Sequence, residues 1–211
     1  LECSADDLEF AGGIFSVKGS PDRAVPIAAL AFAAFTAHNL PDGLEPNLEA
    51  QYTYDPPNFS WPFGTHMAIV EIDVETGKIE VLKYVAVDDC GVQINPLIVE
   101  GQVHGGVIQG LAQALFEEAV YDEDGNLKTT TLAEYLVPAA CDVPSITTAH
   151  TVTPSPTNQL GVKGIGEAGT IGAAPTIINA IIDALSSLGV KHMPMPASPQ
   201  TVWRAIQSAK K

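Results

Sequence analysis

The sequence predicts an α+β fold in which β-hairpins and mixed sheets pack with helices. Two pairs of short segments alternate apolar and polar residues on either side of a turn sequence, as the strands of hairpins do. Longer apolar segments that follow prolines or helix-capping residues lie between and after these pairs. Because the hairpins are interleaved with helices, the pattern differs from the regular strand–helix–strand series of a doubly wound sheet.

The first sixty residues predict one hairpin, one helix and one irregular segment. Leu8–Phe10 and Ile14–Val17 flank the pair Gly12–Gly13, which is typical of a tight hairpin turn. Val25–His38 is rich in alanine and bounded by prolines, and we expect it to form a buried helix. Leu40–Pro62 carries many prolines, glycines and polar residues, which favours a long crossing segment without regular structure.

A second hairpin and two further helices are predicted in the remaining chain. Met67–Val74 and Lys78–Val87 alternate around Glu75–Lys78, a strong hairpin pattern. A helix is expected from about Ala174 to Leu188. Ser198 and Pro199 start a last helix to about Ala209, whose predicted inner face is Val202, Trp203 and Ile206.

Asn95 and Pro96 supply a cap and a first residue for a long helix that we expect to reach about Ala119. Its apolar face comprises Val99, Val103, Val107, Leu111 and Leu115. An adjoining stripe comprises Gln102, Gly105, Gly106, Gln109 and Gln113. Each glycine costs a helix about 1 kcal/mol relative to alanine, so something must pack against the backbone here, either another helix or a ligand.

Composition limits the classes of protein and partner. With 211 residues and 46% hydrophobic content, residues 1–211 can form one domain or two interleaved α+β subdomains. A net charge of −15 argues against nucleic-acid or anionic-membrane binding. We also expect no membrane span, because no apolar run approaches the required length. The three scattered cysteines predict neither disulfides nor a metal site and fit a cytoplasmic protein. Since the chain starts without methionine, we expect it to be part of a longer protein.

Other polar clusters favour structural roles. Asp88 and Asp89, at a strand end, are expected to accept hydrogen bonds from backbone amides. Asp122–Asn126 resembles the start of a calcium loop, but its glycine comes too early and no glutamate closes it, so a strand turn is predicted. The five histidines are isolated, although His104 shares a helix with the paired glycines.

The segment Gly161–Gly172 sets one ionisable acid, Glu167, among glycines and small apolar residues. Its glycines allow a bound group to approach the backbone, and burial there would raise the pKa of Glu167, as a general base requires. Gly164-x-Gly166-x-x-Gly169 also matches a dinucleotide-binding fingerprint. We reject that interpretation, because the proline-broken loop Thr153–Gln159 precedes it instead of a strand, and Asp183 comes too early to bind a ribose.

Three segments, Leu160–Ala173, Val87–Pro96 and Glu100–Gly106, together resemble one protein family. They are similar to the C-terminal part of the large subunit of molybdenum hydroxylases, the xanthine dehydrogenase and aldehyde oxidase family. Within it they most resemble the aerobic carbon monoxide dehydrogenase branch. The resemblance implies molybdenum carried by molybdopterin cytosine dinucleotide, whose dithiolene holds the metal, so no metal ligand is expected from the chain itself.

The resemblance also implies residue roles. Glu167 corresponds to the family glutamate that acts as general base on the water that supplies oxygen. Lys163–Gly166 are near enough to contribute backbone amides to the pterin or its phosphates. The residues implied to bind the cofactor are Gly101, Gln102, Gly105, Gly106, Lys163, Gly164, Ile165 and Gly166.

The implied activity is oxidation of a small carbon substrate, namely CO, an aldehyde or an N-heterocycle. Copper is expected only in a true CO dehydrogenase, and Glu167-Ala-Gly-Thr departs from the Glu-Ser-Ala-Thr form of CO-oxidising chains. The implied partners are the upstream part of the same large subunit, an iron–sulfur small subunit and an FAD medium subunit. Since other family cofactor segments are not found in this sequence, we expect the isolated chain to be inactive. The alternative is a non-catalytic scaffold or assembly chain that completes a cofactor cleft with another polypeptide.

Overall fold

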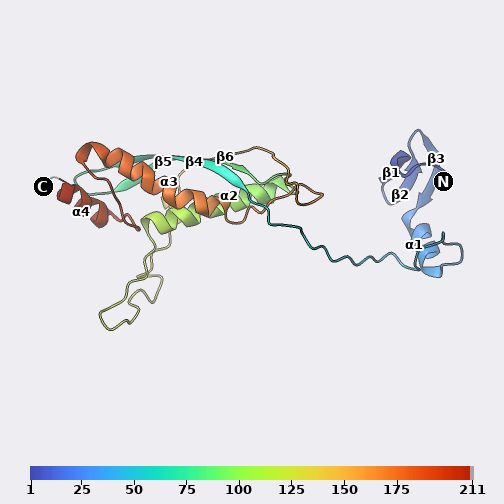
Figure 1. The fold of residues 1–211 in the computed structure, drawn as a ribbon, viewed down its shortest axis with the longest axis horizontal. Helices are drawn as coiled ribbons and strands as arrows, with labels where there is room; N and C mark the ends of the chain where they lie inside the picture. Colours follow the sequence, from blue (N-terminus) through green and yellow to red (C-terminus); the bar gives the residue numbers. More distant parts are fainter. Residues whose placement is uncertain (210–211) are drawn as a thin grey trace. The chain divides into compact units, whose positions relative to one another are not determined.

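The computed structural model describes residues 1–209, which form two compact units that follow one another along the chain. The units are Leu1–Asp55 and Pro56–Lys211 (Figure 1). Each contains one three-stranded sheet, and helices accompany both sheets. This mixture of short sheets and helices confirms the predicted α+β class.

The first unit is an antiparallel sheet followed by a helix. Its strands are β1 (Leu8–Ala11), β2 (Ile14–Val17) and β3 (Ser20–Pro26), in that order. The turn between β1 and β2 consists of Gly12 and Gly13, which both have positive φ, 57° and 80°. Side chains rarely tolerate such angles, so this glycine pair explains the hairpin that the sequence predicts.

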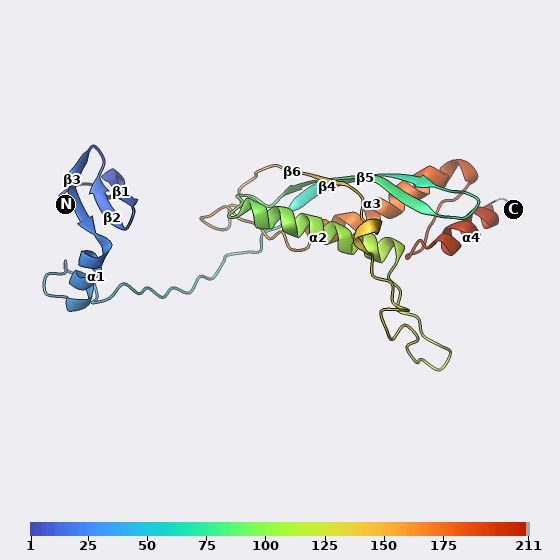
Figure 2. The same ribbon diagram turned by 180° about the vertical axis from the view of Figure 1, so that it is seen from behind.

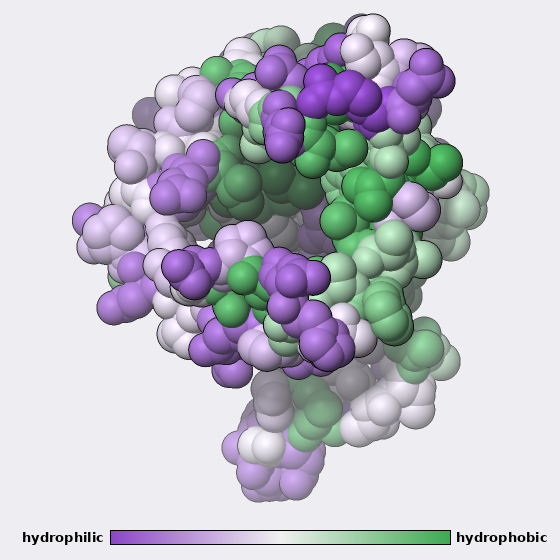
Figure 3. All heavy atoms as spheres, turned by 90° about the vertical axis from the view of Figure 1, so that its right-hand side faces the viewer, coloured by the Kyte–Doolittle hydropathy of each residue, from purple (hydrophilic) through white to green (hydrophobic). Residues whose placement is uncertain are grey.

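Helix α1 (Ile27–Thr36) confirms the predicted helix but not its predicted burial. Only Ala34 is buried, while Phe32 is 72% exposed and Phe35 is 62% exposed. Such apolar side chains form part of the green surface in Figure 3. The prediction is wrong because the first unit is too small to cover a helix that is apolar on all sides. Residues 37–62 contain no helix or strand, as expected of the crossing segment.

The second unit is built on a mixed sheet. Its strands are β4 (Phe63–Ile72), β5 (Ile79–Asp89) and β6 (Ile146–His150). The order is β4-β5-β6, with β4 antiparallel to β5 and β6 parallel to it. Asp73 closes the β4–β5 hairpin by accepting a hydrogen bond from the amide of Glu75 at 2.9 Å. This hairpin is the one predicted from the alternating pattern.

Two long helices pack side by side against this sheet (Figures 1 and 2). Helix α2 (Pro96–Leu115) starts as predicted, because the Asn95 side chain accepts a hydrogen bond from the amide of Ile98. It ends four residues before the expected Ala119, since Phe116 leaves the helical conformation. The largest fully buried side chains of the unit include Tyr84, Val107, Leu111, Ile177, Ile181, Leu185, Val202 and Ile206.

Helix α3 (Ala168–Leu185) begins six residues before the predicted start at Ala174. Gly169 and Gly172 lower the helix propensity of the first turns. Tertiary packing overrides that propensity. A Cβ on Gly169 would lie 2.7 Å from the carbonyl oxygen of Val103, and a Cβ on Gly172 would collide with the ring of His66. Both glycines therefore let α3 approach its neighbours closely.

The segment Ala168–Leu188, α3 with the short 3₁₀ turn after it, is long and apolar enough to cross a membrane by length and composition alone. The expectation that no apolar run approaches this length does not hold for it. However, Ala173, Ile177 and Ile181 are fully buried in the core of the second unit. One face of α3 therefore packs into the core of the second unit.

Helix α4 (Pro199–Ala209) confirms the last predicted helix. The Ser198 side chain accepts a hydrogen bond from the amide of Thr201 and so caps its first turn. Val202 and Ile206 are fully buried, as expected of its inner face. Trp203 is 43% exposed, so its assignment to the inner face is wrong. The apolar pattern of the sequence locates the apolar face of α4, but the elements that pack on α4 decide which edge of that face is buried.

Candidate functional site

Glu167 lies at the junction between the glycine-rich loop and α3. It occupies the N-cap position of the helix, with φ −108° and ψ −12°, and its side chain forms no cap hydrogen bond. The residue is exposed. Residues 1–209 therefore do not provide the burial on which its expected activation as a base depends. They do leave its carboxylate available to a ligand or to another part of the protein.

Gln102 lies beside this junction. It comes from α2, and a Cβ on Gly166 would be 3.8 Å from its side-chain oxygen. The fold thus brings Gln102 next to Gly166, 64 positions away and the residue before Glu167. Gly101 and Gly105, one turn apart on α2, have open space where a side chain would be. We call the exposed residues Gly101, Gln102, Gly105, Gly164, Gly166 and Glu167 the open face.

Gly106 does not belong to the open face. It is buried, and a Cβ there would lie 2.9 Å from the amide nitrogen of Thr170 and 3.0 Å from Cα of Gly169. The Thr170 hydroxyl also donates a hydrogen bond to its carbonyl oxygen at 2.8 Å. Of the two explanations left open for the glycine pair, helix packing applies to Gly106. A cofactor contact of Gly106 stays a prediction.

Lys163 is engaged within the protein. Its ammonium lies 3.1 Å from an oxygen of Asp89 and 4.5 Å from the ring centre of Phe63, and its backbone amide donates to the carbonyl of Cys90 at 2.8 Å. By contrast, the backbone amides of the next three residues donate no hydrogen bond to any other residue that the structure describes. Those three are Gly164, Ile165 and Gly166. The loop therefore offers amides to a ligand from Gly164 onward.

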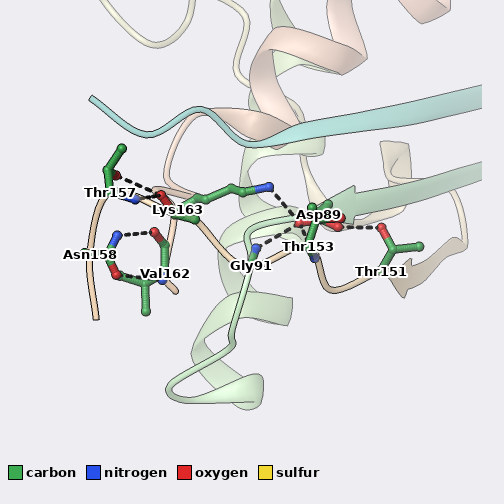
Figure 4. A network of polar contacts seen from close by, with 9 residues as sticks. Asp89, Gly91, Thr151, Thr153, Thr157, Asn158, Val162 and Lys163 are labelled. Carbon is green, nitrogen blue, oxygen red and sulfur yellow. Dashed lines mark hydrogen bonds and ion pairs between the residues drawn. The ribbon is translucent and has the colours of Figure 1, made fainter. Parts of the chain in front are cut away.

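Asp89 collects four donors at the end of β5 (Figure 4). One carboxylate oxygen accepts hydrogen bonds from the backbone amides of Gly91 at 2.9 Å and Thr153 at 3.1 Å, and also from the Lys163 ammonium. The other oxygen accepts a hydrogen bond from the Thr151 hydroxyl at 2.8 Å. Burial alone would raise the pKa of Asp89, but these hydrogen bonds outweigh it and hold the pKa well below its usual range. The predicted bonding to backbone amides is confirmed for Asp89. The link to Lys163 had no local sequence signal.

Asp88 behaves differently from the prediction. Its carboxylate lies 3.3 Å from Nε2 of His66, whose Nδ1 is 2.8 Å from the hydroxyl of Tyr84. All three residues have little or no exposed side-chain surface. Its expected bonding to backbone amides is wrong, because β4 places a buried histidine beside it. Sequence reasoning missed His66, since its partners lie 18 and 22 positions away.

A cavity of about 240 Å³ opens near these residues, between the ends of β5 and β6 and the start of α2. Among the residues expected to bind a cofactor, only Ile165 lines it, together with Asp88, Cys90, Glu100 and His150. The open face lies outside this cavity. No group of three or more histidine, cysteine, aspartate or glutamate side chains among residues 1–209 is arranged to hold a metal ion.

The acidic segment after α2 forms a turn, as predicted. Asp122 accepts hydrogen bonds on one carboxylate oxygen from the amides of Asp124 at 3.0 Å and Asn126 at 2.8 Å. Tyr121 and Leu127 pair across it as an isolated bridge. The carboxylate of Asp122 is thus used to close the turn.

Comparison with known proteins identifies the family. Residues 1–144 match the family model of the molybdopterin cofactor-binding domain. The chain is 42% identical over 207 residues to the carbon monoxide dehydrogenase large chain of Hydrogenophaga pseudoflava and 42% identical over 208 residues to the nicotine 6-hydroxylase large subunit of Paenarthrobacter nicotinovorans. Each alignment covers 98% of this chain and 26% of the relative.

Solved structures agree. Quinoline 2-oxidoreductase from Pseudomonas putida 86 superposes with a TM-score of 0.86 at 42% identity, over 98% of this chain and 26% of that one. The chain thus spans about a quarter of the length of the relatives that it matches. It belongs to the molybdopterin cofactor-binding family and corresponds to a C-terminal portion of the large subunits of molybdenum hydroxylases.

Proposed function

We propose that this chain forms the C-terminal part of a molybdenum hydroxylase large subunit in which Glu167 is the general base. The observation that carries the proposal is the exposed position of Glu167 at the end of the glycine loop, directly after Gly166, which lies beside the Gln102 side chain. Within residues 1–209 its carboxylate accepts no hydrogen bond. A carboxylate without an internal partner, next to open glycines, is suited to a ligand.

The open face fits the organic part of a molybdopterin cofactor. Gly101 and Gly105 leave room for a flat ring system on α2, and the Gln102 amide can both donate to and accept from its polar edge. The amides of Gly164–Gly166 can bind anionic groups such as phosphates. We extend the proposal to the cytosine dinucleotide form because of the family resemblance.

When bound, the cofactor supplies a metal-activated water and a two-electron redox change. A carboxylate oxygen of Glu167 would accept the proton that such a water releases. Because a metal already lowers the pKa of a bound water, a carboxylate suffices as the acceptor. Gln102 and the loop amides orient the cofactor against Glu167.

The substrate is proposed as a class: CO, an aldehyde or an N-heterocycle. Sequence identity does not choose among them, since the named CO dehydrogenase and nicotine 6-hydroxylase subunits are both 42% identical to the chain. Copper is part of the proposal only if the substrate is CO. Copper analysis of the purified complex separates CO from the other two substrates, and molybdenum and CMP analysis tests the cofactor.

The remainder of the large subunit is proposed as the first partner. Phe32 and Phe35 expose most of their surface on α1, and about three quarters of the length of the relatives lies outside this chain. Burial of such side chains contributes about 1.5–3 kcal/mol each, which favours their coverage by the rest of the subunit. By resemblance, an iron–sulfur subunit and an FAD subunit complete a cytoplasmic enzyme.

The test replaces Glu167 with glutamine in the complete enzyme. Glu167→Gln should lower turnover at least about a hundredfold while molybdenum and CMP contents stay normal. Asp183→Asn, which changes another exposed carboxylate of α3, is the matched control and should retain activity. Near-wild-type turnover of a molybdenum-replete Glu167→Gln enzyme would refute the role of Glu167. A molybdenum-replete complete subunit without activity would favour the scaffold alternative.

A further inference from the structure

The loop that carries Glu167 is held mainly through the residues that precede its exposed part. Asn158 pairs with Val162 through two hydrogen bonds, at 2.9 and 3.0 Å, and the carbonyl of Gly161 accepts from the amide of Val92 at 3.0 Å. Lys163 is the last residue held in this way. From Gly164 to Gly166 the described structure shows no donated amide hydrogen bond, and then Glu167 follows.

Lys163 is fixed at both its backbone and its side chain. The amide hydrogen bond to Cys90 anchors the backbone, and the ammonium is enclosed between Asp89 and the face of Phe63. The side chain of Lys163 is only 8% exposed and that of Asp89 is not exposed. A lysine side chain enclosed in this way is confined to one orientation, whereas the side chain of a surface lysine is mobile.

Asp89 is in turn fixed by donors from two other segments. The amide of Gly91 belongs to the turn after β5, and Thr151 and Thr153 belong to the segment after β6 (Figure 4). The ion pair therefore connects the start of the Glu167 loop to the end of β5, to the turn after β5 and to the segment after β6. Its two residues are 74 positions apart in the sequence.

Stability alone is a weak explanation for this arrangement. Burying two charges carries a desolvation penalty that their attraction often only offsets, so apolar residues of similar size can be equally stable. Buried ion pairs are better at selecting one conformation among several. We propose that Asp89 and Lys163 are positioning residues that set the place of the Glu167 carboxylate, which rests on the proposed function of Glu167.

The test is a double-mutant cycle in the complete enzyme. Lys163→Met removes the ammonium and keeps much of the volume, and turnover is followed by dye reduction with CO, an aldehyde and an N-heterocycle. A small misplacement of a catalytic group costs up to about a hundredfold in rate, so we expect kcat to fall about tenfold to a hundredfold with KM and molybdenum content little changed. Lys163→Arg should restore much of the loss, and Lys83→Met, at an exposed lysine of β5, should have no effect.

The decisive variant combines Lys163→Met with Glu167→Gln. If Lys163 acts through Glu167, the double variant should be no slower than Glu167→Gln alone. Hydrogen exchange should also quicken in residues 164–170 but not in α2. If Lys163→Met does not fold, the same double-mutant cycle is measured with Lys163→Gln, whose amide can still donate a hydrogen bond to Asp89.

Several outcomes overturn the inference. A full additional loss in the double variant would show that Lys163 does not act through Glu167. Loss of CMP and molybdenum in Lys163→Met would make Lys163 a cofactor ligand, and unchanged kcat would remove any positioning role. These results leave the role of Glu167 intact. By contrast, an active Glu167→Gln enzyme refutes the proposed function itself.

Discussion

Gly105 and Gly106 are neighbours on α2, and the structure predicts that alanine has opposite effects at the two positions. A Cβ on Gly105 meets no atom within 4 Å, whereas a Cβ on Gly106 lies 2.9 Å from the amide nitrogen of Thr170, where ordinary contact begins at 3.4 Å. The obstructing atoms at Gly106 belong to the backbone of α3. They cannot move aside as a side chain could, so α2 and α3 must separate.

The expected magnitudes follow from two opposing terms. Alanine favours a helix over glycine by about 1 kcal/mol, so Gly105→Ala should stabilise the chain by up to that amount. Gly106→Ala gains the same term but adds an overpacking penalty of about 1–3 kcal/mol. Helix propensity cancels in the comparison of the two variants. The difference between their free energies of unfolding should therefore be about 1–3 kcal/mol, with Gly105→Ala the more stable.

Urea unfolding of the 211-residue chain, followed by far-ultraviolet circular dichroism, measures this difference directly. Gly110→Ala is a useful companion, because its Cβ would lie 2.6 Å from Cβ of Ala173 in the same helix crossing. It should also destabilise. If Gly106→Ala is as stable as Gly105→Ala, with equal denaturant dependence, the close helix contact is refuted.

Two further predictions concern pH and assembly. Burial raises the pKa of Tyr84 to about 12, and the Asp88 charge adds to this rise against the Thr176 hydrogen bond. In the unfolded chain the pKa of Tyr84 is about 10, so ionisation of Tyr84 favours unfolding as pH rises above about 10. Tyr84→Phe should therefore reduce the loss of stability at alkaline pH, measured by urea unfolding. Phe32→Ser should change the stability of the isolated chain by less than about 0.5 kcal/mol, because Phe32 is 72% exposed. In the complete large subunit the same substitution should lower the yield of assembled protein in gel filtration, and normal assembly would contradict coverage of α1.

Local sequence patterns were sufficient for most elements. The hairpin at Gly12–Gly13 was predictable because only glycine readily adopts the positive φ angles that its turn requires. The starts of α2 and α4 were predictable because Asn95 and Ser198 cap helices through short-range hydrogen bonds. Such interactions join residues a few positions apart, so neighbouring letters contain the information. The family followed from the order of three segments, and the large subunits to which the chain is 42% identical align with 98% of it.

Other features depend on distant residues, and no local pattern could reveal them. The early start of α3 follows from glycines that fit against α2 and β4. Trp203 is 43% exposed because residues 1–209 cover that edge of α4 only in part. The sequence placed Lys163 in the Glu167 loop, but only the fold directs its side chain to Asp89, 74 positions away.

By itself, therefore, the sequence determined the hairpins, the helices and the acid within its glycine loop, because short-range geometry and capping specify them. Tertiary structure decided which of two adjacent glycines faces open space and which contacts another helix. It also decided that the first unit leaves most of α1 exposed. These outcomes depend on which helices and strands pack together, and that packing joins residues that are far apart along the chain.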